Sequence, residues 1–171
     1  DGVRMLVMCA VDRGGSGCMC PASAFLRALL RHLMLREKSA VILDMEAGIE
    51  HLGRGTTRGM DLMIVVVEPG ARSLETAERI KKLSSEIGIK HLAAVINKGG
   101  SGKVNDKLEE LGIQVLGEIP FDPKLMQADL EKRAPIEVGG EAVDAIIKIK
   151  EKLTEVVEEI RIEEASKASK N

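Results

Sequence analysis

The sequence is almost free of aromatic residues: its 171 residues include two Phe and neither Trp nor Tyr. A chain of this length forms a domain with a buried core. That core must therefore be built from aliphatic side chains, with the eight Met residues as filler. Long apolar runs are also missing. The longest, such as residues 62–67, fall far short of the roughly 20 residues of a membrane-spanning helix, which argues against a membrane protein.

An excess of positive charge is missing too. The formal net charge is -2 and the pI is about 6.0, so the chain has no basic surplus to neutralise the phosphates of DNA or RNA.

Cysteine is limited to Cys9, Cys18 and Cys20, too few for a secreted disulfide framework. We therefore expect a cytoplasmic protein, in which clustered thiols are metal ligands or redox groups. The chain opens with Asp1 rather than Met and has no signal peptide, which suggests a fragment or a processed chain.

Short apolar runs alternate with longer segments of helical periodicity. The runs, typical of buried parallel strands, are residues 5–10, 40–44, 62–67, 91–97 and 115–119. The helical segments are residues 21–36, 73–87, 103–111, 123–132 and 141–162. This alternation predicts an α/β fold, a doubly wound parallel sheet with helices on both faces. We expect one domain over residues 1–163, followed by a frayed polar tail at 164–171.

The second apolar run ends in Asp44, and the small pair Ala47-Gly48 follows it. At the carboxyl end of a parallel strand, a carboxylate can face a metal–phosphate complex. The small pair lets the backbone approach a ligand, so that the Gly48 amide could meet a terminal phosphate. The local pattern is equally compatible with Asp44 as the N-cap of a helix.

Cys18 and Cys20 place two sulfurs in one loop, immediately before a helical segment that begins at Pro21. A helix N-terminus favours thiolate over thiol. Two chains related by a two-fold axis would bring four thiolates to one metal ion. The pattern alone also allows two small buried cysteines. Cys9, in the middle of an apolar run, is expected in the core.

These segments resemble a known family. Asp-x-x-Ala-Gly after an apolar strand, at Asp44 to Gly48, is similar to the switch II segment of the MinD/Mrp/ParA class of P-loop ATPases. The longer strings over residues 44–55 and 66–79 resemble the CooC-type nickel-insertion ATPases of carbon monoxide dehydrogenase, and the resemblance spans about residues 5–135. It implies that Asp44 helps to hold the water shell of Mg²⁺ and that Gly48 contacts the γ-phosphate of ATP.

The resemblance also implies the remaining parts of a site. Asn97-Lys98 and the segment from Pro120 to Asp122 are similar to the two adenine-contacting loops of these ATPases, with Asn97 as the main reader of the base. The alternative for both is an ordinary turn. The Cys-x-Cys pair would bind Ni²⁺, or Zn²⁺, at a homodimer interface. ATP or ADP with Mg²⁺ would be the cofactor, and carbon monoxide dehydrogenase the client.

One glycine-rich segment imitates the phosphate-binding loop of this class. Lys98-Gly-Gly-Ser-Gly-Lys103 lies between an expected strand and an expected helix, but Val104 stands where a Ser or Thr hydroxyl should bind Mg²⁺. We therefore expect the phosphate-binding loop upstream of Asp1, in about 80 further residues. Without it the chain should bind and hydrolyse ATP poorly.

Two other functions stay open from the sequence. One is a non-catalytic, truncated ATPase-like interaction module whose cysteines are structural. The other is an ATPase of the same class with a different cargo, such as an iron–sulfur cluster. The acidic pI argues against a third role, DNA partitioning.

Overall fold

The computed structural model describes residues 3–7, 28–29, 40–45, 60–100 and 102–169. The chain divides into two compact units, Asp1–Met45 and Glu46–Asn171. In the first unit, residues 28–29 are helical and residues 3–7 and 40–45 have no regular secondary structure.

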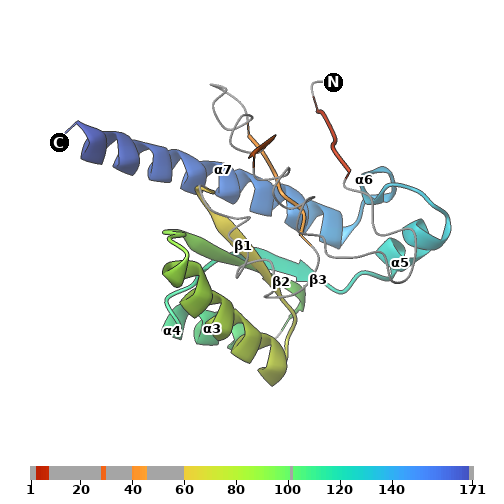
Figure 1. The fold of residues 1–171 in the computed structure, drawn as a ribbon. Helices are drawn as coiled ribbons and strands as arrows, with labels where there is room; N and C mark the ends of the chain where they lie inside the picture. Colours follow the sequence, from red (N-terminus) through yellow and green to blue (C-terminus); the bar gives the residue numbers. More distant parts are fainter. Residues whose placement is uncertain (1–2, 8–27, 30–39, 46–59, 101, 170–171) are drawn as a thin grey trace, which may run out of the picture. The chain divides into compact units, whose positions relative to one another are not determined.

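The second unit contains a parallel sheet of three strands (Figure 1). β1 (Met63–Val67) pairs with β2 (Leu92–Gly99), and β2 pairs with β3 (Gln114–Pro120), in the order β1-β2-β3. β-Branched and aliphatic residues dominate β1 and the first half of β2, as is typical of strands in a parallel sheet. A register shift after Ala94 sets Val95 opposite Gly117.

Helices cover both faces of this sheet, as Figure 1 shows. α3 (Ala71–Glu86) follows β1 and α4 (Lys103–Glu110) follows β2; both lie on one face, and α7 (Glu141–Ala168) lies on the other. Two short helices, α5 (Pro123–Leu130) and α6 (Pro135–Val138), connect β3 to α7.

Each face has its own hydrophobic core. The core under α3 and α4 is formed by Val65, Val67, Ala77, Ala94, Ile96, Val104, Leu108 and Ile113. The core under α7 is formed by Ala93, Val95, Leu116, Ile149, Val156 and Ile160. Alternate residues of β2 enter opposite cores, as the period of two along a strand dictates. The α/β architecture expected from the sequence is confirmed.

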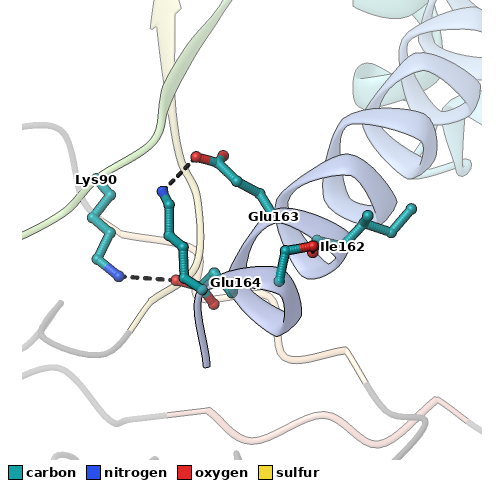
Figure 2. A network of polar contacts seen from close by, with 6 residues as sticks. Lys90, Ile162, Glu163 and Glu164 are labelled. Carbon is teal, nitrogen blue, oxygen red and sulfur yellow. Dashed lines mark hydrogen bonds and ion pairs between the residues drawn. The ribbon is translucent and has the colours of Figure 1, made fainter. Parts of the chain in front are cut away.

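The end of α7 is fixed to the rest of the unit by charged side chains (Figure 2). Lys90, in the loop before β2, forms a 3.0 Å ion pair with Glu164. One turn along the helix, Lys167 lies 2.5 Å from Glu163, and its hydrogen bond and positive charge lower the pKa of the Glu163 carboxyl. Exposed pairs of this kind each contribute little to stability.

Three of the five expected strands match β1, β2 and β3, and four expected helices match α3, α4, α5 and α7. The strands expected at residues 5–10 and 40–44 were wrong over their described parts, residues 5–7 and 40–44, which form no strand. Met5 is 85% exposed and Ile42 is 89% exposed. An apolar run becomes a strand only when a neighbour accepts its backbone hydrogen bonds, and a residue pattern does not specify that neighbour. α6 was missed, and α7 continues past Ile162 to Ala168.

Candidate functional site

Because the three strands are parallel, their carboxyl ends meet at one edge of the sheet, where open α/β sheets bind their ligands. The register places Asn97 opposite Ile119 and Gly99 opposite Pro120. The two loops expected to contact a base, which begin at Asn97 and at Pro120, are therefore neighbours. Asn97 and Pro120 are both half-buried, while the Lys98 side chain is exposed.

The loop after β1 is linked to the carboxyl end of β2. The Glu68 backbone N–H donates to the Ser73 hydroxyl oxygen at 3.1 Å, which ties the turn to the first part of α3. The Glu68 carboxylate forms a 2.8 Å ion pair with the Lys98 ammonium group. Lys98 has a positive φ of 55°, which is uncommon for a residue with a Cβ. Sequence reasoning did not select Glu68, although a carboxylate directly after a buried strand is the same signal that selected Asp44.

The loop after β3 is held by a helix cap. The Asp122 carboxylate accepts a 2.9 Å hydrogen bond from the Lys124 backbone N–H, and Pro123 occupies the first turn of α5. A Cβ placed on Gly140, just before α7, would lie 2.5 Å from the other Asp122 oxygen, so the two segments are in close contact. The Asp122 side chain thus has a structural role. Beside it Phe121 is 60% exposed.

The glycine-rich segment after β2 leads into α4, as expected from the sequence. Val104 is 7% exposed and belongs to the core under α3 and α4. The position that would carry a Mg²⁺-binding hydroxyl in a phosphate loop is here a packing position. Lys103, one residue before it, is exposed.

Comparisons with known proteins find ATP-binding relatives, although no protein-family model matches the chain. An uncharacterised ATP-binding protein of Methanocaldococcus jannaschii is 46% identical over 151 residues, which cover 86% of this chain and 58% of that protein. CooC, the carbon monoxide dehydrogenase accessory protein of Rhodospirillum rubrum, is 45% identical over 132 residues, or 75% of this chain and 49% of CooC. The chain belongs to the MinD/ParA class of P-loop ATPases, close to CooC.

The fold of this class is recovered in a solved structure. The MinD cell division protein of Aquifex aeolicus matches with a TM-score of 0.66 at 21% identity, over 77% of this chain and 60% of MinD. The present chain spans about half the length of the relatives it matches in sequence.

The other residues expected to form the site of a MinD/ParA-class protein belong to other parts of the chain. Asp44 is exposed and lies in the first unit, in a segment without regular secondary structure. Gly48, Cys18 and Cys20 lie outside the described residues. Among the described residues, no group of three or more His, Cys, Asp or Glu side chains could hold a metal ion. None of the described helices is both long enough and apolar enough to cross a bilayer.

Proposed function

We propose that this chain is part of an ATP-dependent maturation factor of the CooC kind, which serves carbon monoxide dehydrogenase. The observation that carries the proposal is the 45% identity to CooC, a protein named as an accessory protein of that enzyme. The neighbouring loops at the carboxyl edge of the sheet support the nucleotide part of the proposal, because a ligand at this edge would contact both.

In this proposal the edge binds the adenine end of ATP. The Asn97 amide offers both a donor and an acceptor to the base. The backbone from Pro120 to Asp122 closes over the ring, and Lys98, paired with Glu68, holds the first loop in place. Asp44 would orient water molecules around Mg²⁺, and the Gly48 amide would contact the γ-phosphate. Hydrolysis of ATP would be the activity of the full-length protein.

The metal is cargo in this mechanism. Cys18 and Cys20 from each of two subunits would supply four thiolates to one Ni²⁺ ion, a ligand set that Zn²⁺ also accepts. ATP would favour the closed homodimer, in which the thiolates come together, and hydrolysis would release the metal to the client. Coupling of this kind requires that metal and ATP favour the same state.

Replacing Asn97 tests the nucleotide site. Asn97→Ala removes two hydrogen bonds to the base, so we expect ATP affinity of the full-length protein to fall about 5- to 100-fold, measured by calorimetric titration. Asn105→Ala is the matched control. Asn105 is also half-buried, but it lies on α4 and its amide donates to Glu109 at 2.8 Å. Equal losses in the two variants, or none in either, would exclude Asn97 as the base reader.

Native mass spectrometry of the reduced protein tests the metal site. Titrated with Ni²⁺ without oxygen, the protein should form a species with one metal ion per two chains. The double variant Cys18→Ser with Cys20→Ser should lose this species, and the control Cys9→Ser should keep it. Retention of nickel by the double variant would remove the metal role. Reconstitution that yields only an iron–sulfur cluster at the same cysteines would change the cargo and keep the ATPase.

A further inference from the structure

Glu118 is a carboxylate at the carboxyl edge that the proposed nucleotide site has not used. It lies on β3 opposite Ile96, whose side chain belongs to the core under α3 and α4. Asn97 lies one register position further, opposite Ile119, which packs against the core under α7. By the alternation of side chains along a strand, Asn97 and Glu118 lie on opposite faces of the sheet, both within three residues of the carboxyl edge where a ligand would bind.

Gly99 makes room for this carboxylate. A Cβ placed on Gly99 would lie 3.0 Å from the carboxyl carbon and 3.0 Å from an oxygen of Glu118, closer than ordinary contacts allow. The backbone of Gly99 is not in the left-handed region, so conformation alone does not require glycine here. The absence of a side chain at residue 99 instead lets the Glu118 carboxylate rest against the loop that follows Asn97.

The Glu118 carboxylate has no partner of its own among the described residues. Lys98, the nearest cation along the loop, is paired with Glu68 at 2.8 Å. In the described ranges, no hydrogen bond or ion pair joins the Glu118 carboxylate to another residue; its backbone pairs with β2. The carboxylate is only partly buried, so a ligand that donates a hydrogen bond can reach it.

Asn97 cannot choose between bases by itself. Its amide can rotate to present either a donor or an acceptor, so it can pair with adenine or with a 6-oxopurine. An ionised carboxylate is an acceptor only, and it therefore favours the exocyclic amine of adenine and repels a carbonyl oxygen at the same place. A site that combines the two groups reads the base with the amide and discriminates with the carboxylate.

We propose that Glu118 is the residue that selects adenine over 6-oxopurines, by accepting a hydrogen bond from the exocyclic amine. This inference rests on the proposed nucleotide-binding function. It gives a role to a residue of β3 that the two base-contacting loops do not include. It also accounts for the glycine at residue 99, where a side chain would collide with the Glu118 carboxylate.

The test compares ATP with inosine triphosphate, which differs at the 6-position of the base. For the full-length wild-type protein we expect calorimetric titration to give a preference for ATP of about tenfold or more. Glu118→Gln should reduce that preference to within about threefold, because an amide can donate to the 6-oxo group. Gly99→Ala should reduce it as well, because the added methyl group displaces the carboxylate while its charge remains.

Glu141→Gln is the matched control, since Glu141 is an exposed carboxylate at the start of α7. It should keep the wild-type preference. The ratio of two affinities does not depend on the folded fraction, so partial misfolding of a variant does not obscure the result. If Glu118→Gln and Gly99→Ala both bind ATP and keep the full preference for ATP over inosine triphosphate, Glu118 does not select the base. The proposed nucleotide-binding function would stand in that case. If the wild-type protein binds neither nucleotide, the proposed function fails and the inference with it.

Discussion

Gly117 is the point at which the packing of α7 against β3 can be tested most directly. It lies on the strand that ends at Pro120, and a Cβ added to it would lie 2.7 Å from Cγ1 and 3.3 Å from Cδ1 of Ile149. Carbon atoms in contact are normally 3.5–4.0 Å apart. Ile149 is buried against the sheet, so it cannot move away without shifting α7 or leaving its rotamer.

The magnitude follows from two opposing terms. Overpacking of this kind costs about 1–3 kcal/mol. Replacing glycine in a strand by alanine returns about 0.5–1 kcal/mol, because the unfolded chain loses freedom. Gly117→Ala should therefore lower the free energy of unfolding by about 1–2 kcal/mol in urea denaturation. A stabilised variant would show that α7 does not press on this strand.

A double-mutant cycle attributes the loss to Ile149. Ile149→Ala removes both atoms that the new methyl group meets, so the two substitutions together should cost about 1–2 kcal/mol less than the sum of their separate effects. Ile160→Ala is the control, because Ile160 belongs to the same core but lies three turns further along α7. Its effect should add to that of Gly117→Ala. Additivity for both pairs would refute the contact.

Two further predictions concern the other core and the end of α7. Leu108→Ala should destabilise the protein by about 2–5 kcal/mol in urea denaturation, because Leu108 is fully buried under α3 and α4. Leu130→Ala is the control: Leu130 is 83% exposed, so its replacement should change the free energy of unfolding by less than about 0.5 kcal/mol. Similar losses would contradict the assigned core. Lys167→Ala should raise the pKa of the Glu163 carboxyl toward its ordinary value, because the hydrogen bond and the positive charge of Lys167 are lost; a carbon-detected NMR titration checks this. Because the pKa is lowered in the folded state, any contribution of this pair to stability is present above the pKa of Glu163 in the unfolded chain, and it is lost as the pH falls through the lowered pKa of the folded state. An unchanged Glu163 titration would show that Lys167 is not its partner.

The sequence predicted the second unit better than the first because the second unit provides its own strand partners. Residues 62–67 and 91–97 pair with each other as β1 and β2, so an apolar run was a sufficient guide there. Residues 40–44 have the same apolar character, yet they form no strand. Pairing is a property of two segments, and composition describes only one.

Glu118 was missed at the site for the same reason: a sequence pattern does not specify which segments pair. Asn97 and Pro120 could be selected because each follows an apolar run, and the resemblance to a known class gave them a role. Glu118 could not be selected, because its position depends on the register of β3 against β2 and on the missing side chain at Gly99. No spacing along the sequence encodes that contact.

The carboxyl edge is held in place by interactions that do not involve a ligand. Ser73 and Lys98 hold the loop after β1 through Glu68, and the Asp122 cap holds the loop after β3 against the start of α7. Each interaction is weak by itself, but together they set the backbone that carries Asn97 before any nucleotide arrives. A site that is already ordered loses less entropy on binding, so its few polar groups can contribute more of their interaction energy to affinity. Glu68→Gln should therefore weaken ATP binding by up to about fivefold without contacting the nucleotide, since an exposed ion pair contributes about 0.2–1 kcal/mol. The loss should disappear at high salt, where the pair is screened in the wild-type protein as well. A loss that persists at high salt would mean that Glu68 acts on the nucleotide itself.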